Sequence, residues 1–150
     1  MAKTAVILMN LGGPDCRESI RPFLMNFFMD PNILRVPIPF RCFLAALIAR
    51  KRTKKEAGES YGELGDKSPL LENTKAQAKA LQKALGKDFS VHIHMRYWHP
   101  LAPHAVYNLR EEAPDRVILL PLYPQYSTTT TRSSLNALAK AMREQGFTDT

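Results

Sequence analysis

The sequence has few cysteines and no long hydrophobic run, and both absences limit the classes of protein that it can encode. Its 150 residues include two cysteines, Cys16 and Cys42, which are not in a C-x-x-C arrangement and cannot build a disulfide framework. No apolar run reaches the roughly 18 residues that a bilayer-spanning helix needs. We therefore predict a protein of a reducing, cytoplasmic compartment. The short apolar run Ala5–Asn10 is interpreted as a buried strand rather than a signal peptide.

The sequence signatures of several enzyme classes are also missing. Gly12-Gly13-Pro14 follows the first predicted strand but does not form G-x-G-x-x-G, the pattern of dinucleotide-binding folds. Thr128–Thr131, with Ser133 and Ser134, could cradle an anion at a helix N-terminus, but no lysine follows as in nucleotide-binding loops. The G-x-S-x-G of serine hydrolases is absent. These absences argue against a nucleotide site and against acyl transfer.

Positive charge exceeds negative charge in the chain. The 21 lysines and arginines against 14 aspartates and glutamates give a net charge of +7. This balance suits nucleic acid, an anionic membrane or an acidic small molecule as a partner. The basic residues concentrate in Arg50–Lys55 without interleaved aromatic residues, which disfavours nucleic acid and is most often a solvated helix face. We expect no nucleic-acid partner, and the length predicts a single domain over residues 1–150.

Hydrophobic patterns predict alternating strands and helices. Strands are expected at Ala5–Asn10, Phe89–Tyr97 and Val117–Leu122, the last as a continuous apolar run covered on both faces. Helices are expected from Ser19 to before Asp30 and over Phe40–Ala49, Thr53–Leu64, Ser68–Leu85, Leu101–Glu112 and Arg132–Gln145. This order is typical of strands joined by helical crossovers. The predicted fold class is α/β, a Rossmann-like parallel sheet with helices on both faces.

Polar and aromatic side chains follow two of the predicted strands. Arg96 and Tyr97 end the second strand, and Tyr123 and Tyr126 follow the third. In open α/β sheets, ligands bind at the carboxyl ends of strands. An arginine beside aromatic rings holds a carboxylate or stacks on a π-system there; the alternative is an ion pair with a helix carboxylate. The combination favours a flat, partly polar ligand.

Two histidines form the one candidate metal pair that the spacing suggests. His92 and His94 share a face of the second predicted strand, because side chains two residues apart point the same way. No third ligand is placed by the spacing, and partly buried structural histidines are the alternative. We predict no resident metal site.

The segment of residues 33–52 is apolar over most of its length and basic at its end. Phe40–Ala49 is expected to form a helix that is apolar on almost every side, and Arg50-Lys51-Arg52 follows it. Such a helix is either buried in a core or rests on an apolar surface from outside. Peripheral contact of this segment with the inner face of the membrane is one hypothesis, and a plain core helix is the other.

Six stretches of the sequence together resemble ferrochelatase, the enzyme family that inserts Fe²⁺ into a porphyrin at the end of haem biosynthesis. They run in register along almost the whole chain: MNLGGP (Met9–Pro14), FLMNFFMDPNIL (Phe23–Leu34), ARKRT (Ala49–Thr53), SPLL (Ser68–Leu71), RYWHP (Arg96–Pro100) and LYPQYSTTTTRSSLN (Leu122–Asn136). The resemblance implies two similar Rossmann-like halves with porphyrin in the cleft between them. This chain resembles the N-terminal half of that chelatase fold.

The resemblance also implies roles for individual residues. Arg96 and Tyr97 would support catalysis near the macrocycle on the metal-entry side. The other matched positions would bind the substrate: Leu11, Phe27 and Phe28 at the macrocycle, Arg52, Tyr61 and Ser68 at the propionates, and Tyr123, Ser127 and Thr129 along the floor. Fe²⁺ would be a substrate, and no further cofactor is implied.

The sequence departs from the family's pattern at several points. Gly65-Asp66-Lys67 stands where the family has three glycines, and one residue is inserted before Tyr61. Thr128 stands where some members have a cysteine ligand, so no iron–sulfur cluster is expected. The family's active-site histidine belongs to its second half, and the histidines here do not match it. We expect this chain alone to be inactive.

Two alternatives stay open at this point. The chain could be a porphyrin- or haem-binding module without catalysis, or a chelatase that acts on cobalt or sirohydrochlorin. The sequence does not determine which porphyrin is bound, which metal is preferred or whether the chain forms oligomers.

Overall fold

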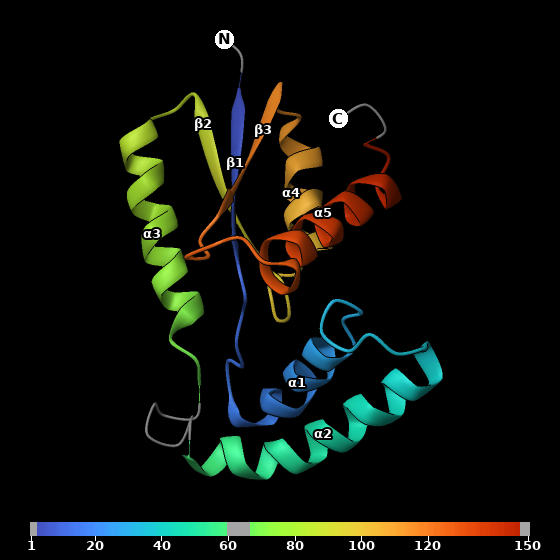
Figure 1. The fold of residues 1–150 in the computed structure, drawn as a ribbon. Coiled ribbons are helices and arrows are strands. Elements are labelled where there is room, and N and C mark those ends of the chain that lie inside the picture. The colour runs from blue at the N-terminus through green and yellow to red at the C-terminus, as the bar shows by residue number, and fades with distance from the viewer. Residues whose placement is uncertain (1–2, 60–66, 148–150) are drawn as a thin grey trace. The chain divides into compact units, whose positions relative to one another are not determined.

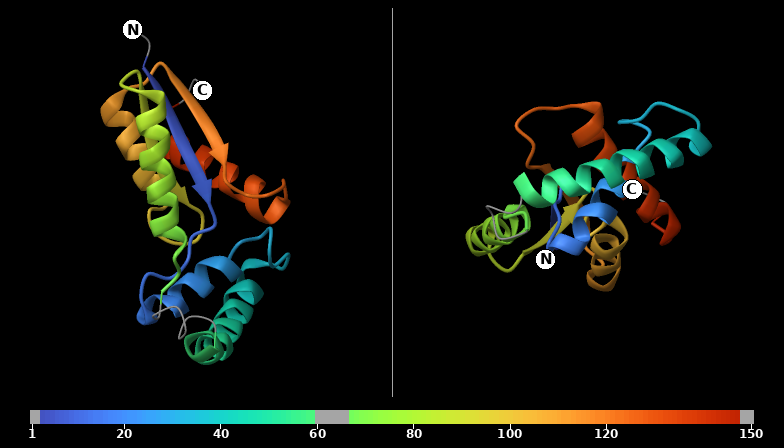
Figure 2. Two further views of the ribbon diagram at one scale, coloured as in Figure 1. Left: turned by 90° about the vertical axis from the view of Figure 1, so that its left-hand side faces the viewer. Right: turned by 90° about the horizontal axis from the view of Figure 1, so that it is seen from below.

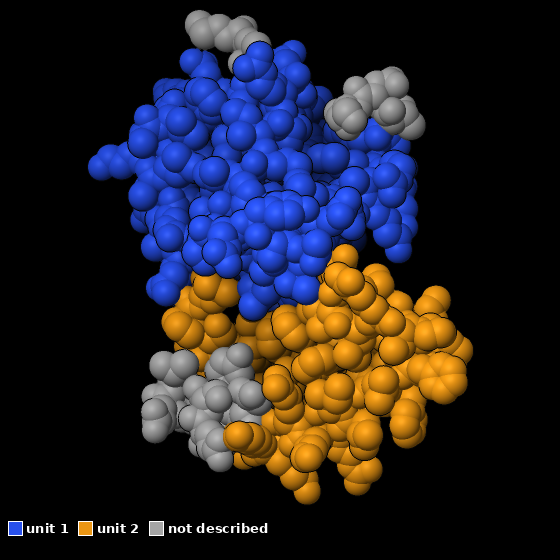
Figure 3. Space-filling view, viewed as in Figure 1, with its two compact units in different colours: residues 1–11, 72–150 blue, residues 12–71 orange. Residues whose placement is uncertain are grey.

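The computed structural model describes residues 3–59 and 67–147, with residues 56–59 described by their backbone alone. The chain divides into two compact units (Figure 3). Unit 1 comprises Met1–Leu11 and Glu72–Thr150, and unit 2 comprises Gly12–Leu71. Each unit has its own hydrophobic contacts.

Unit 1 is built on a three-stranded parallel sheet with β1 at its centre (Figure 1). β1 (Thr4–Asn10) pairs with β2 (Phe89–Met95) on one side and with β3 (Arg116–Pro121) on the other. Thr4 lies in register with Phe89 and with Arg116. The order β2-β1-β3, with α4 (Ala102–Glu112) connecting the two outer strands, confirms the predicted parallel α/β sheet.

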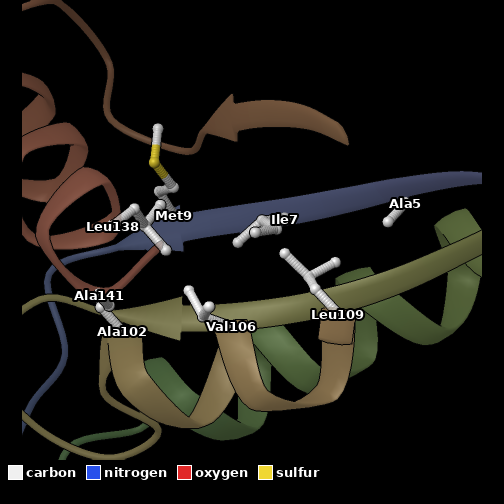
Figure 4. Close-up of a cluster of buried hydrophobic side chains, with 8 residues drawn as sticks. All are labelled: Ala5, Ile7, Met9, Ala102, Val106, Leu109, Leu138 and Ala141. Atoms are coloured by element: carbon white, nitrogen blue, oxygen red, sulfur yellow. The ribbon is translucent and has the colours of Figure 1, made fainter. Parts of the chain in front are cut away.

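Helices cover both faces of the sheet, as the sequence predicts. α4 and α5 (Ser133–Glu144) lie on one face, and α3 (Leu70–Leu85) lies on the other (Figure 2). On the first face, alternate residues of β1 pack against both helices (Figure 4). The cluster consists of Ala5, Ile7, Met9, Ala102, Val106, Leu109, Leu138 and Ala141. The intervening residues of β1, Val6 and Leu8, pack with Ala78 of α3.

This two-sided packing explains why β1 is apolar at every central position. Burial of one Leu, Ile or Met side chain stabilises a fold by about 1.5–3 kcal/mol, and β1 contributes such residues to both clusters. β2 also follows its predicted two-residue period, because Val91 and Ile93 pack with the α3 cluster while His94 points to the other face.

β3 differs from its prediction. The sequence predicts coverage on both faces, but Ile118 and Leu120 are 41% and 38% exposed. Only Val117 and Leu119, which face α4 and α5, pack into the core. A continuous apolar run does not reveal whether a strand lies at the centre of a sheet or at its edge, and in the described residues β3 lies at an edge. β2 is also shorter than predicted, ending at Met95 rather than Tyr97.

Unit 2 consists of two helices preceded by the 3₁₀-turn η1 (Arg17–Ser19). α1 (Ile20–Phe28) packs against α2 (Ile38–Glu59). On α1 the buried residues are large, including Phe23 and Leu24, and on α2 they are the small residues Ala45 and Ala49.

α2 corrects the prediction of two helices over Phe40–Ala49 and Thr53–Leu64. It is one continuous helix, because Ala49–Lys55 are mostly good helix formers and contain no proline or glycine. Pro39 lies in its first turn, where a missing N–H does no harm. Arg41 fixes the preceding loop by donating from Nε and Nη2 to the carbonyls of Leu34 and Val36. The predicted helix end near Gly65 lies outside the described residues.

Candidate functional site

The candidate site residues divide between the two units. Leu11, Arg96, Tyr97, Tyr123, Ser127 and Thr129 belong to unit 1. Phe27, Phe28, Arg52 and Ser68 belong to unit 2, and Tyr61 lies outside the described residues. That all of these residues border a common pocket stays a prediction.

In unit 1, the backbone beyond the ends of the strands is tied to β1 and the residue after it. The N–H groups of Arg96 and Tyr97 donate to the carbonyls of Asn10 (2.9 Å) and Leu11 (3.0 Å). The N–H of Leu122 donates to the carbonyl of Met9 (2.9 Å). The chain segments that leave the three strands therefore stay side by side, as expected at the ligand-binding edge of an open α/β sheet.

Arg96 is held by a buried serine. Its Nε donates to Oγ of Ser133 at 2.6 Å, and its guanidinium carbon lies 4.7 Å from the centre of the Tyr97 ring. Ser133 is fully buried at the start of α5. The guanidinium of Arg96 is thus oriented both by a charge-assisted hydrogen bond and by an aromatic face.

Tyr97 packs its ring against the guanidinium of Arg96. It is fully buried, and its hydroxyl donates to the carbonyl of Thr129 at 3.0 Å and lies 3.4 Å from Oγ of Ser133. Tyr97 thus packs against Arg96 and is hydrogen-bonded to the loop at Thr129, and its side chain presents no exposed surface.

Tyr123 is hydrogen-bonded to Ser134, the residue of α5 that follows the partner of Arg96. Its hydroxyl lies 2.8 Å from Oγ of Ser134, which is fully buried. Burial raises the pKa of Tyr123, and the Ser134 hydrogen bond and the charge of Arg96 offset only part of this effect. At neutral pH the phenol is therefore uncharged and can donate or accept a hydrogen bond, but it is not a base.

The hydroxyl-rich loop before α5 forms hydrogen bonds within itself. Oγ of Ser127 accepts from the N–H of Thr130 at 3.1 Å and lies 2.6 Å from Oγ1 of Thr130 and 3.1 Å from Oγ1 of Thr129. The chain then makes a π-helical turn, η2 (Thr128–Arg132), before α5 begins. π-Turns inside helices are often found at functional sites. Ser133 and Ser134, suggested as part of an anion cradle, hold protein side chains instead.

In unit 2, the candidate residues form an aromatic group next to a cation. The ring centres of Phe27 and Phe28 are 5.2 Å apart with an edge-to-face geometry, and Phe23 lies 6.3 Å from Phe27. Phe28 is buried and Phe27 is half-buried. The guanidinium carbon of Arg52 lies 5.6 Å from the centre of the Phe28 ring.

Arg52 also lines a hollow on α2. The hollow has a volume of about 340 Å³ and is bordered by Ile48, Lys51, Arg52 and Lys55. Lys51 and Arg52 lie one helical turn after Ile48, and Lys55 lies one turn further on, so three cationic side chains border one apolar side chain. Such a hollow is suited to an apolar molecule that has a carboxylate group.

The apolar side chains near the start of α2 are exposed. Phe40, Phe43 and Leu47 are 66%, 67% and 54% exposed, contrary to the hypothesis of a plain core helix. Among the described helices, none is long and apolar enough to cross a membrane.

Ser68 links the last residues of unit 2 to its first residues. Its N–H donates to the carbonyl of Pro14 at 2.8 Å, and its Oγ accepts from the N–H of Leu70 at 3.3 Å, which caps α3 as predicted. A Cβ on Gly13 would lie 2.5 Å from Cβ and Oγ of Ser68. The second glycine of the Gly12-Gly13 pair is thus required because Ser68 packs directly against its Cα.

The two candidate histidine ligands have different surroundings. Nε2 of His92 lies 3.2 Å from Glu112 Oε2 and 3.2 Å from Ser90 Oγ. His94 is fully buried, and no hydrogen-bond partner is found for either ring nitrogen. Among the side chains of residues 3–55 and 67–147, no group of three or more His, Cys, Asp or Glu could hold a metal ion.

Sequence reasoning missed the roles of Ser133 and Ser134. A pair of small polar residues at a helix start is usually interpreted as capping or anion binding. Here they face the ends of β2 and β3, so each hydroxyl meets one candidate side chain. Only the position of α5 over the sheet reveals this pairing.

Comparison with known proteins gives one consistent result. The ferrochelatase family model matches residues 3–149. A ferrochelatase of Wolbachia sp. subsp. Drosophila simulans (strain wRi) is 50% identical over 150 residues, covering 97% of this chain and 47% of the relative. Ferrochelatases of Caulobacter vibrioides (strain NA1000 / CB15N) and Aquifex aeolicus (strain VF5) are 48% and 49% identical, covering 99% and 94% of this chain and 44% and 45% of the relatives. The chain thus spans about half the length of the curated relatives that it matches.

Proposed function

Because the chain belongs to the ferrochelatase family, we propose that it forms the N-terminal half of an enzyme that inserts Fe²⁺ into protoporphyrin IX in haem biosynthesis. The family match over residues 3–149 is the observation that carries this proposal. The geometry within each unit supports it, because both units hold cations next to aromatic rings. A porphyrin is a flat aromatic ring that carries carboxylates, so both features have a counterpart on the substrate.

The role of unit 2 is to bind the propionates and one face of the ring. Arg52 donates to a propionate from the rim of its hollow, with Lys51 and Lys55 contributing positive charge. Phe27 is half-buried, and its exposed part contacts the macrocycle. The ring of Phe28 packs against the guanidinium of Arg52 and orients it. A hydrogen bond between charged groups stabilises a complex by about 1.5–3 kcal/mol, and exposure of Arg52 to water places its contribution at the lower end.

The role of unit 1 is to present fixed polar groups beside the macrocycle. Arg96 carries a permanent positive charge and Tyr123 a neutral hydroxyl, and both are oriented by α5. Neither group accepts a proton at neutral pH. His94 is fully buried, and burial together with the charge of Arg96 lowers its pKa to about 4, so it also stays unprotonated at neutral pH.

Metal insertion needs a base for the two pyrrole protons, and we propose that this base lies outside the present chain. Binding energy from the propionates and the ring would help to distort the porphyrin so that its nitrogen lone pairs face the metal. The 150-residue chain alone should therefore bind porphyrin without inserting metal.

Absorbance titration of protoporphyrin IX with the purified chain tests the binding role. We expect Arg52→Ala to weaken binding by about tenfold, as the loss of a partly exposed charged hydrogen bond predicts. The control Lys83→Ala, an exposed cation of α3 in unit 1, should bind like the wild type. With the dimethyl ester of the porphyrin, the effect of Arg52→Ala should vanish. Equal affinity of the wild type and Arg52→Ala for the free acid would contradict the propionate role.

Incubation of the chain with protoporphyrin IX and Fe²⁺ or Zn²⁺ tests the second part of the proposal. No metalloporphyrin should form above the rate without protein. Turnover by the chain alone would show that it contains its own base.

The alternative is a module that binds porphyrin or haem without chemistry. The binding module predicts the same titration results for the 150-residue chain. The two functions are therefore distinguished by assaying metal insertion with the complete product of the gene. Metal insertion by that product supports the chelatase, and binding without insertion supports the module.

A further inference from the structure

A chain of hydrogen bonds runs from the end of β2 to the loop that precedes α5. Nε of Arg96 donates to Oγ of Ser133 at 2.6 Å, and that hydroxyl lies 3.4 Å from the hydroxyl of Tyr97. The hydroxyl of Tyr97 donates in turn to the carbonyl of Thr129 at 3.0 Å. All four residues belong to unit 1, and Ser133 and Tyr97 are fully buried. Protein groups, rather than bulk water, therefore determine how the two hydroxyls point.

This chain of hydrogen bonds has one direction, because each hydroxyl has a single proton to donate. Tyr97 uses its proton on the carbonyl of Thr129, so Ser133 is the donor between the two hydroxyls. Ser133 thereby keeps its lone pairs turned toward the guanidinium of Arg96. Hydrogen bonds linked in this way polarise and strengthen one another in a buried environment. Loss of the Tyr97 hydroxyl would leave the Ser133 proton without this acceptor and allow the serine to rotate away from Arg96.

The same tyrosine hydroxyl also lies at the π-turn η2. At the end of this turn, the N–H of Ser133 donates to the carbonyl of Thr130, three residues earlier. In an α-helix, that N–H would donate to the carbonyl of Thr129, four residues earlier. Here the carbonyl of Thr129 accepts from the hydroxyl of Tyr97. Because a side chain that enters the backbone ladder in this way distorts a helix, we infer that Tyr97 stabilises the π-turn.

Arg96 acts electrostatically on a second candidate site residue, Tyr123. Burial raises the pKa of the Tyr123 phenol, and the hydrogen bond with Ser134 and the positive charge of Arg96 each lower it in part. The hydroxyl of Tyr123 lies 2.8 Å from Oγ of Ser134, which follows Ser133 at the start of α5. Two adjacent helix residues therefore hold groups that come from the ends of two different strands. The ionisation of Tyr123 consequently reports whether Arg96 stays in place.

We propose that Tyr97 and Ser133 are positioning residues of the candidate site: the Tyr97 hydroxyl holds the π-turn and orients Ser133, and Ser133 fixes the guanidinium of Arg96 near Tyr123. The role of Arg96 at the macrocycle belongs to the proposed function, on which this inference rests. An arginine side chain loses conformational freedom when it binds a ligand, so holding it in place beforehand reduces the cost of binding. In this role neither positioning residue needs to touch the substrate.

A pH titration of the Tyr123 phenol tests this arrangement without any ligand. It is followed by NMR in the 150-residue chain with carbon-13 at Cζ of tyrosine, and the Tyr123 signal is assigned by its loss in Tyr123→Phe. Tyr97→Phe keeps the ring and removes only the hydroxyl. We expect it to raise the pKa of Tyr123, as Arg96→Gln also should, because the positive charge moves away. The matched control Tyr107→Phe, at an exposed tyrosine of α4, should leave the titration unchanged.

A double variant tests whether Tyr97 acts through Ser133. Ser133→Ala alone should also raise the pKa of Tyr123, and Tyr97→Phe should add little to it, because members of one hydrogen-bonded chain do not act independently. Ser127→Ala loosens the π-turn from its other end, since Oγ of Ser127 accepts from the N–H of Thr130 at 3.1 Å, and should shift the titration in the same direction. Circular dichroism spectra check that the variants fold, and Ser127→Ala replaces Tyr97→Phe if that variant does not.

Absorbance titration with protoporphyrin IX connects the arrangement to the proposed function. Tyr97→Phe should weaken binding by about two- to tenfold, the loss expected for one hydrogen bond. The control Tyr107→Phe should bind like the wild type. If the wild type itself binds no porphyrin, the proposed function is contradicted, and the Tyr123 titration still decides whether Tyr97 and Ser133 hold Arg96.

Three outcomes would overturn the inference. An unchanged Tyr123 titration in Tyr97→Phe would mean that the hydroxyl does not hold Arg96 in place. Additive shifts from Tyr97→Phe and Ser133→Ala would mean that Tyr97 does not act through Ser133. Unchanged porphyrin affinity in a Tyr97→Phe chain whose Tyr123 titration has shifted would mean that the position of Arg96 has no effect on the substrate.

Discussion

Replacement of His94 by leucine should make the chain markedly less sensitive to acid. His94 is fully buried in β2, and burial, followed by the positive charge of Arg96, lowers its pKa from 6.5 to about 4. The nearby carbonyl of Pro100 offsets part of this shift, although no hydrogen bond of good geometry is formed to either ring nitrogen. The folded chain therefore keeps this imidazole neutral at pH values where the unfolded chain protonates it.

The sign and size of the effect follow from proton linkage. Between pH 6.5 and about 4, the unfolded state binds one more proton than the folded state, so the free energy of unfolding falls as the pH falls. The stabilisation is fully present above pH 6.5 and is lost as the pH approaches 4. The full shift corresponds to about 3 kcal/mol, and the part lost between about pH 7 and about pH 4.5 is about 2 kcal/mol.

Urea unfolding followed by circular dichroism measures this loss. Between about pH 7 and about pH 4.5, the wild type should lose about 2 kcal/mol more than His94→Leu does. Carboxylates that titrate in the same range contribute to both proteins and cancel in the comparison. The control Ile93→Val, on the same strand but without an ionisable group, should cost about 0.5–1.5 kcal/mol at both pH values. Equal losses in the wild type and His94→Leu would refute the buried neutral imidazole.

Three further substitutions test the packing on which the site depends. Ser133→Ala should weaken porphyrin binding several-fold and cost about 1.5–3 kcal/mol in urea, because it removes the hydroxyl that accepts the charge-assisted hydrogen bond from Arg96 Nε, and Ser134→Ala should leave that guanidinium in place and alter only the contact with Tyr123. Gly13→Ala should lower the melting temperature sharply, with recovery when Ser68→Gly removes the atoms 2.5 Å from the new Cβ; no recovery would mean that the glycine has another role. Leu138→Ala, in the centre of the α4–α5 cluster, should cost about 2–5 kcal/mol of unfolding free energy, and a loss under 1 kcal/mol would contradict the packing described.

Much of unit 1 was predictable because its signals are local. A buried central strand must be apolar at every position, as Ala5–Met9 are. The period of two places Val91 and Ile93 opposite His94, and Ser68-Pro69, at the end of unit 2, marks the start of α3. The family was also predictable, since its motifs are short stretches whose residues are adjacent in the chain.

The remaining features depend on residues that are distant in sequence. Nothing in the Val117–Leu120 run shows that one of its faces lacks a covering helix. The hydrogen bond from Arg96 to Ser133 joins residues 37 positions apart, and it exists because α5 begins beside the end of β2.

Thus the sequence by itself determined the alternation of strands and helices, the faces of β2 and membership of the family, because these rest on periodicity and on contiguous motifs. Only the tertiary structure decided which apolar residues are exposed on α2 and β3 and which serines hold Arg96 and Tyr123. Apolar residues have the same pattern whether they face a helix or water, and a hydroxyl acquires a partner only when folding brings one within about 3 Å.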